Sequence, residues 1–242
     1  MNYFRDVEGM PISLISERTA FTPSGNVLKQ KHEIEDRKTG TTTVGIIAKD
    51  CIILAADQRA TMGHIAEKDV RKVYKITDNV ALTIAGALGD SLAMIRFLKA
   101  QANLYEIERG TKMTPRAAAS LLSNVLSNNR YYPYIFQPIV GGVSTKPELF
   151  ELSPFGDISE KDDYAMTGSG TTFAMTTFDK EYTRNLSETD AIALAVRAVR
   201  AATNRDIYSG GDSVTVAIIY KHGYREADKG DIEKIVKATK FN

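Results

Sequence analysis

The 242-residue sequence contains one cysteine, three histidines and a net charge of only +1. One cysteine excludes an internal disulfide framework and suits a reducing cytosol. Cys51 adjoins the apolar run Ile52–Ala56, so we interpret it as a small core residue rather than a catalytic thiol. The histidines lie in charged or turn contexts, which disfavours a Ser-His-Asp triad. The balanced charge gives no reason to expect nucleic acid or a membrane surface as a partner.

Other absences narrow the class of protein further. No metal-ligand spacing and no phosphate-binding Gly-Lys-Thr motif occurs, so we expect no metal or cofactor, and any ATP dependence would belong to a partner. No apolar stretch approaches the roughly 20 residues that span a bilayer, and no apolar segment of a secretory signal is found. A composition of 43% hydrophobic and 25% charged residues favours a soluble, cytoplasmic protein with one sizeable core.

The most informative feature that is present is the run Gly40-Thr41-Thr42-Thr43-Val44-Gly45. Threonine-rich, β-branched runs are common in ordinary strands, which is the plainest interpretation of this one. Cleavage between Gly40 and Thr41 would give a second interpretation, because the freed α-amine has a pKa of roughly 7.7–8.0 and can accept the proton of the hydroxyl on the same residue. One broken peptide bond would then create a nucleophile and its base.

Five later segments accompany this run in a fixed order. They are Asp57-Gln58-Arg59-Ala60-Thr61, Lys68 to Lys72, Ile84 to Asp90, Thr167-Gly168-Ser169-Gly170, and Asn204-Arg205-Asp206 with Ser209-Gly210-Gly211. In this order and spacing the chain resembles the archaeal-type β subunits of the proteasome, which are N-terminal-nucleophile hydrolases. The resemblance extends from Thr41 to about Val236. It implies an α+β fold, a four-layer αββα sandwich in which helices flank two packed antiparallel sheets.

The hydrophobic pattern predicts the same kind of layering, because strands cluster in pairs with helix pairs between them. Strands are expected at Thr43–Ala48, Cys51–Asp57, Ala81–Ala85, Tyr134–Val143, Glu148–Leu152 and Ser213–Tyr220. Helices are expected at Ser91–Arg109, from Thr114-Pro115 through Leu126, from Ser187 to about Arg205, and at Asp231–Ala238.

Residues 1–40 differ from the rest of the chain. They hold few apolar residues after Phe21 and a dense mixed-charge run from Lys29 to Lys38 without helical periodicity. A flexible tail is one interpretation. The resemblance implies another, a propeptide removed by autocatalytic cleavage between Gly40 and Thr41, which leaves residues 41–242 as the catalytic domain.

The resemblance also implies roles for charged residues near Thr41. The ammonium of Lys72 would lie beside the threonine hydroxyl and lower the cost of forming an alkoxide, and Asp57 would keep that lysine charged and oriented. Lys68 and Lys75 are weaker candidates for the same position. Without the family, Asp57 is a solvated turn carboxylate and Lys72 a surface lysine.

Three further positions complete the catalytic set that the resemblance implies. Gly86 would donate its backbone N–H to an oxyanion, at a place where a side chain would block the substrate. Ser169 would bond the amine of Thr41, and Asp206, expected at the end of a helix, would support Ser169. Their alternatives are a strand-ending glycine, a turn or helix cap, and a helix-terminal carboxylate.

A specificity pocket beside Thr41 follows from the resemblance. The matching positions are Ala60, Val70, Tyr74, Ile84, Leu88 and Leu92. All are apolar or aromatic, so we expect a chymotrypsin-like preference for a hydrophobic side chain before the scissile bond.

The resemblance implies an assembly as well. Similar subunits form seven-membered rings, with two β rings stacked between two rings of α subunits, and degrade unfolded polypeptides inside, with a regulatory ATPase as a further partner. Three alternatives stay open, namely a subunit of the bacterial two-component peptidase, a noncatalytic ring subunit, and an amidohydrolase for small molecules.

Overall fold

The computed structural model describes residues 20–21, 27–28, 40–62 and 64–238. The chain divides into two units, residues 1–37 and residues 38–242. In the first unit, strands β1 (Ala20–Phe21) and β2 (Val27–Leu28) form an antiparallel pair. The elements below all belong to the second unit.

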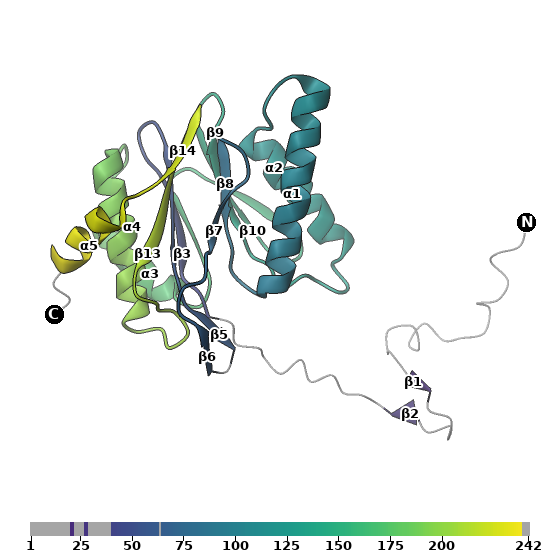
Figure 1. The fold of residues 1–242 in the computed structure, drawn as a ribbon, viewed down its shortest axis with the longest axis horizontal. Coiled ribbons are helices and arrows are strands. Elements are labelled where there is room, and N and C mark those ends of the chain that lie inside the picture. The colour runs from purple at the N-terminus through teal and green to yellow at the C-terminus, as the bar shows by residue number, and fades with distance from the viewer. Residues whose placement is uncertain (1–19, 22–26, 29–39, 63, 239–242) are drawn as a thin grey trace, which may run out of the picture. The chain divides into compact units, whose positions relative to one another are not determined.

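Two five-stranded antiparallel sheets form the centre of the second unit (Figure 1). The first sheet has the strand order β12-β3-β4-β13-β14, with β3 (Thr43–Ile47), β4 (Ile52–Asp57), β12 (Tyr164–Thr167), β13 (Val214–Tyr220) and β14 (Gly223–Glu226). The second has the order β11-β10-β9-β8-β7, with β7 (Val73–Lys75), β8 (Val80–Thr83), β9 (Ile139–Val143), β10 (Pro147–Leu152) and β11 (Ile158–Lys161). Strands β5 (Ala60–Met62) and β6 (His64–Glu67) pair separately.

Helices cover the outer face of each sheet (Figure 1). Helices α1 (Leu88–Arg109) and α2 (Pro115–Asn128) pack on the second sheet. Helices α3 (Thr171–Glu181) and α4 (Glu188–Thr203) pack on the first sheet, and α5 (Lys229–Ala238) packs beside α4. The predicted αββα sandwich is therefore confirmed.

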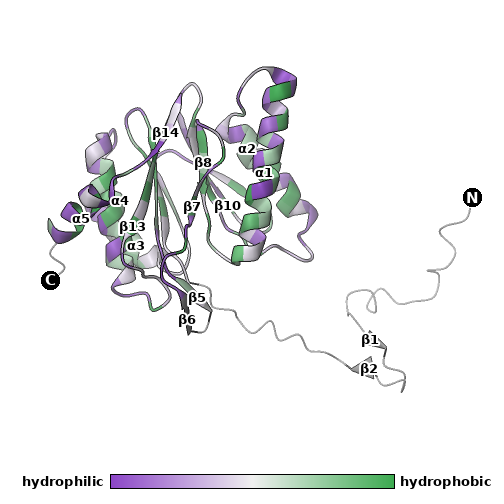
Figure 2. Ribbon diagram, in the orientation of Figure 1, coloured by the Kyte–Doolittle hydropathy of each residue, from purple (hydrophilic) through white to green (hydrophobic). Residues whose placement is uncertain are grey.

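Strand β4 shows why this sequence needs covering layers on both sides. All six of its residues are buried. Ile52, Leu54 and Ala56 face the other sheet, whereas Ile53 and Ala55 face the helices. Side chains alternate along a strand, so an uninterrupted apolar run has no face that can meet water. Figure 2 shows the strands of both sheets as largely hydrophobic and the helices as mixed.

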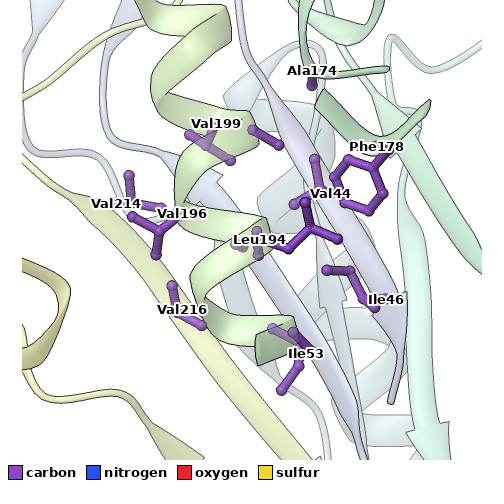
Figure 3. Close-up of a cluster of buried hydrophobic side chains, with 14 of the residues drawn as sticks. Val44, Ile46, Ile53, Ala174, Phe178, Leu194, Val196, Val199, Val214 and Val216 are labelled. Atoms are coloured by element: carbon purple, nitrogen blue, oxygen red, sulfur yellow. The ribbon is translucent and has the colours of Figure 1, made fainter. Parts of the chain in front are cut away.

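The core between α4 and the first sheet is built from interlocking aliphatic side chains. In Figure 3, Leu194, Val196 and Val199 of α4 lie against the strands that carry Val44 and Val216. Phe178 of α3 closes this cluster and is almost fully buried, which is worth about 1.5–3 kcal/mol relative to an exposed side chain.

Two helices begin at the capping residues that the sequence predicts. The hydroxyl of Thr114 accepts from the N–H of Ala117 at 3.1 Å, and Pro115 follows at the first helical position. The hydroxyl of Ser187 accepts from the N–H of Asp190 at 3.2 Å. Each such cap typically stabilises a helix by about 1 kcal/mol.

Some expected bounds were wrong. Helix α1 begins at Leu88 rather than Ser91, and the strand expected at Tyr134–Val143 starts only at Ile139. Helix α4 ends at Thr203, so Asp206 lies in the turn after the helix rather than on it. The N–H of Asp206 nevertheless donates to the carbonyl of Ala202 at 2.8 Å and thereby satisfies a terminal carbonyl of the helix.

The sequence also predicts that Cys51 is a core residue and that no segment spans a membrane. Cys51 is 3% exposed within the core under α4, and burial raises the pKa of its thiol to about 11. Its interpretation as a core residue is confirmed. No helix among the described residues is long and apolar enough to cross a membrane.

Candidate active site

The candidate nucleophile and its neighbouring cation come from different sheets. Thr41 lies two residues before β3 of the first sheet, and Asp57 is the last residue of β4 beside it. Lys72 immediately precedes β7 of the second sheet. The site therefore forms at one end of the sandwich, where the two sheets meet.

Lys72 contacts both of the other residues. Its Nζ lies 2.9 Å from Oγ1 of Thr41 and 2.8 Å from Oδ1 of Asp57. It also donates to the carbonyl of Arg59 at 2.6 Å and lies 3.4 Å from the carbonyl oxygen of Gly40. The lysine is 3% exposed and Asp57 is fully buried, so this ion pair is sealed from solvent.

The environment of Lys72 has opposing electrostatic effects. Burial disfavours the charged ammonium and lowers the pKa of Lys72 below its usual value, while the neighbouring Asp57 carboxylate raises it in part. Four oxygen atoms lie within hydrogen-bond distance of Nζ, and hydrogen bonds to such acceptors favour the ammonium over the neutral amine.

The Asp57 carboxylate is held from several directions. Oδ1 accepts from the N–H of Thr42 at 2.9 Å, and Oδ2 accepts from the N–H groups of Gly210 at 2.9 Å and Arg59 at 3.3 Å. These donors fix the carboxylate and compensate its burial. The orientation of Lys72 is thereby set by backbone groups from three separate segments.

A second group of polar side chains meets the backbone nitrogen of Thr41. That nitrogen donates to Oγ of Ser169 at 3.2 Å, and Ser169 donates to Asp206 at 2.5 Å. Ser209 also donates to Asp206. Its Oγ is hydrogen-bonded to Oγ1 of Thr42, and the two oxygen atoms lie 2.7 Å apart. The carboxylate thus orders two serine hydroxyls at the residue where an amine would arise.

Close backbone approach explains two glycines in the site. Gly168 has a φ of 99°, and a Cβ there would lie 2.1 Å from the carbonyl oxygen of Thr41. A Cβ on Gly40 would lie 1.6 Å from Cβ of Tyr208. The structure around Thr41 therefore accommodates no side chain at position 40 or position 168.

The structure shows a further requirement for glycine at position 86. Gly86 has a φ of 121°, and a Cβ would lie 2.2 Å from the carbonyl oxygen of Ile135. Backbone conformation and a neighbouring chain segment thus require glycine here, in addition to the predicted approach of a substrate. Gly86 still lines the cavity beside Thr41.

A cavity of about 250 Å³ opens beside Thr41 and Lys72. Its walls include four of the six predicted pocket residues, namely Ala60, Val70, Ile84 and Leu88. The other two, Tyr74 and Leu92, do not line it and instead pack against the core beneath α1 and α2.

Sequence reasoning missed several residues of this region. Thr61 and Glu67 line the cavity, so its wall includes a carboxylate. Ser209 takes part in the hydroxyl network, although the sequence assigned no role to its Ser-Gly-Gly segment. The guanidinium of Arg59 donates to the carbonyl of Ile207.

The other lysine candidates lie elsewhere. Lys75 pairs with Asp78 at 2.7 Å, and Lys68 is exposed. Among the residues that the structure describes, no group of histidine, cysteine, aspartate and glutamate side chains could hold a metal ion.

Comparison with known proteins identifies the family. A model of proteasome subunits matches residues 37–219, a range that includes every candidate catalytic residue. This chain belongs to the proteasome subunit family. A proteasome subunit beta of Methanocaldococcus vulcanius is 43% identical over 204 residues, which cover 83% of this chain and 91% of that protein. Proteasome subunit beta 1 of Pyrococcus furiosus is 45% identical over 192 residues, or 79% of this chain and 97% of that protein.

A second relative from the same archaeon extends the comparison. Proteasome subunit beta 2 of Pyrococcus furiosus is 42% identical over 205 residues, which cover 84% of this chain and 98% of that protein. The predicted resemblance to archaeal proteasome β subunits is thus confirmed, and the two flanked sheets are the sandwich fold of the family.

The buried ion pair leads to a test of stability. We expect Asp57→Asn to lower the free energy of unfolding by about 3–5 kcal/mol, because it leaves the Lys72 ammonium buried without its counter-ion. Urea unfolding of the full chain measures this change.

Asp78→Asn is the matched control. Asp78 also bonds two lysines, Lys75 and Lys112, but it is exposed, so its replacement should cost under about 1 kcal/mol. Equal losses in the two variants would contradict a sealed ion pair at Lys72.

Proposed function

We propose that this chain is a catalytic β subunit of the 20S proteasome core, a threonine endopeptidase that degrades unfolded polypeptides in the cytoplasm. The observation that carries the proposal is the 2.9 Å contact between Nζ of Lys72 and Oγ1 of Thr41. A lysine ammonium sealed against a threonine hydroxyl has a chemical use, because it stabilises the alkoxide that a nucleophile must form. A cation 4 Å from such an oxygen is worth about 4 kcal/mol at an effective dielectric constant of 20.

In the mature enzyme the α-amine of Thr41 is the base. It accepts the hydroxyl proton as Oγ1 attacks the substrate carbonyl, and the N–H of Gly86 donates to the resulting oxyanion. The intermediate collapses to an ester on Thr41 and releases the amine product, which takes the proton. Water then attacks the ester while the α-amine of Thr41 removes a proton from that water. The bond to Oγ1 breaks, the acid product leaves, and the proton returns to Oγ1. Ser169, held by Asp206, keeps the amine nitrogen in place.

The same hydroxyl cleaves the chain at Gly40–Thr41. Oγ1 of Thr41 lies 2.7 Å from the carbonyl oxygen of Gly40, and the Lys72 ammonium lies 3.4 Å from that oxygen, where it polarises the carbonyl. Attack of Oγ1 on the carbonyl carbon forms an ester as the bond between Gly40 and the nitrogen of Thr41 breaks, and the hydroxyl proton passes to that nitrogen. Hydrolysis of the resulting ester releases residues 1–40 and leaves the free amine.

Substitutions at Thr41 test both steps. We expect Thr41→Ala to abolish peptide cleavage and to leave residues 1–40 attached, because no hydroxyl remains. Thr41→Ser should retain both functions at reduced rates, since it preserves the hydroxyl and the amine. Intact-mass measurement and hydrolysis of a fluorogenic peptide report the two steps, in chains assembled with α subunits. An active Thr41→Ala chain would contradict the proposal, and a wild-type assembly that never cleaves peptides would indicate a noncatalytic subunit.

The cavity beside Thr41 supports a chymotrypsin-like preference. Ala60, Val70, Ile84 and Leu88 give it largely apolar walls, which favour a hydrophobic side chain before the scissile bond. Peptides ending in Leu, Tyr or Phe should therefore be cleaved faster than those ending in Arg or Glu. The ratio of their kcat/KM values measures this preference.

Glu67 provides the control for this preference. Its carboxylate is the one acidic group in the described cavity wall, so Glu67→Gln separates its influence from that of the apolar side chains. Faster cleavage after Arg or Glu in both the wild type and Glu67→Gln would exclude this cavity as the specificity pocket.

Exposed apolar side chains support assembly into rings. Ile107 near the end of α1 is 81% exposed, and Tyr131 after α2 is 79% exposed. Leu104 and Ile135 are also exposed. Leu104 and Ile107 lie three residues apart and therefore share one face of α1, and exposed apolar groups on one face are typical of subunit contacts. We infer seven-membered β rings, two of which stack between α rings, with a regulatory ATPase as a further partner.

A charge on this surface tests the assembly. We expect Ile107→Glu to reduce the fraction of chain that enters full-size particles with α subunits, because it buries a charge at a contact. Native mass spectrometry measures that fraction. Glu108→Gln, on the adjacent exposed position of the same helix, is the control and should assemble normally. Normal assembly of Ile107→Glu would remove this end of α1 from the interface.

A further inference from the structure

Three buried threonine hydroxyls connect the two sheets behind the candidate active site. Thr43 of β3 and Thr167 of β12 belong to the first sheet, and Thr83 of β8 belongs to the second. Oγ1 of Thr83 donates to Oγ1 of Thr43 at 3.1 Å, and the hydroxyls of Thr43 and Thr167 lie 2.7 Å apart. None of the three residues is more than 1% exposed.

The Thr83 hydroxyl has a partner in each sheet. Its Oγ1 accepts from the N–H of Ile139 in β9 at 3.2 Å and donates to Oγ1 of Thr43. Thr43 in turn bonds Thr167 of its own sheet. The chain of hydrogen bonds therefore runs from the backbone of one sheet to a side chain at the edge of the other, and each hydroxyl has a partner.

The surroundings of this chain are apolar. The facing side chains between the sheets include Ile52, Leu54, Ala81, Ile139 and Leu149. Contacts between aliphatic side chains are not directional, so they hold the sheets together without specifying one lateral position. A hydrogen bond requires a particular distance and angle, and the Thr83–Thr43 bond supplies that requirement.

This bond lies next to both halves of the reactive pair. Thr43 is the first residue of β3 and follows Thr41 by two residues. Thr83 is paired with Val73, the residue after Lys72, and the N–H of Ile84 donates to the carbonyl of Lys72 at 2.9 Å. The bond thus joins the strand that presents the nucleophile to the strand that anchors the cation.

We propose that Thr83 and Thr43 are positioning residues, whose hydrogen bond sets the spacing of the two sheets at which Nζ of Lys72 reaches Oγ1 of Thr41. This inference rests on the proposed peptidase function. Neither hydroxyl touches the substrate. Their effect on the reaction is exerted through the position of Lys72 relative to Thr41.

The test compares kcat for variants that remove the bond with kcat for variants that keep it. We expect Thr83→Val to lower kcat about tenfold, because a small displacement of a charge from the nucleophile costs much of its effect, while KM stays within about twofold. Thr43→Val removes the same bond from the other sheet and should have a similar effect. Thr83→Ser retains the hydroxyl and should restore at least half of the wild-type kcat.

A control separates positioning from loss of stability. Val140→Ala removes buried volume from β9 on the helix-covered face and leaves the three hydroxyls intact. It should lower the melting temperature without lowering kcat. All variants are measured as particles assembled with α subunits, far below their melting temperatures. Each kcat is divided by the fraction of chains that begin at Thr41, determined by intact mass.

The double variant provides an independent criterion. If the two threonines act through one bond, Thr83→Val combined with Thr43→Val should reduce kcat no more than either change alone. If Thr83→Val does not assemble, Thr83→Ala is used in its place, because it removes the hydroxyl without adding a methyl group.

The outcomes distinguish this inference from the proposed function. An unchanged kcat in Thr83→Val, a loss no larger than that of Val140→Ala, or a Thr83→Ser variant as slow as Thr83→Val would overturn the inference alone. Wild-type particles without peptidase activity would overturn the proposed function and the inference with it.

Discussion

The site depends on keeping the ammonium of one lysine almost fully buried. Lys72 is 3% exposed, and its ammonium is compensated by Asp57 and by two oxygen atoms of uncharged groups. The carboxylate is in turn held by three backbone N–H groups. Removing any of these partners would leave a buried charge or donor unsatisfied. The ends of β4 and β7 and the turn after α4 must therefore come together before the site can exist.

The sandwich gives these segments a common end. Strand β4, apolar on both faces, requires a layer on each side, and the second sheet and α4 provide them. Closing the two sheets on each other brings the residue before β7 to the start of β3. The fold thereby places a cation from one sheet beside a hydroxyl from the other, although the two residues are far apart in the sequence.

Much of the fold was predictable because its strong signals are local. The capped starts of α2 and α4 and the apolar run of β4 have unambiguous patterns. Helix α3 was missed, since its threonine-rich sequence has a low helix propensity and its stability comes from tertiary packing of residues such as Phe178. Strand β11 was missed because it is short and largely exposed.

The candidate site was likewise predictable only in part. The motif pattern predicted which polar residues gather around Thr41, whereas Tyr74 and Leu92 do not line the described cavity. The spacing of residues along the chain did not show whether these side chains line the cavity or pack into the core behind it. The close contact at Gly40 bears on maturation. Tyr208 leaves no room for a side chain at position 40, so the proposed cleavage depends on glycine at a place that the proposed mature chain would lack. Under that proposal, a substitution of Gly40 would act on processing rather than on the chemistry of the processed subunit.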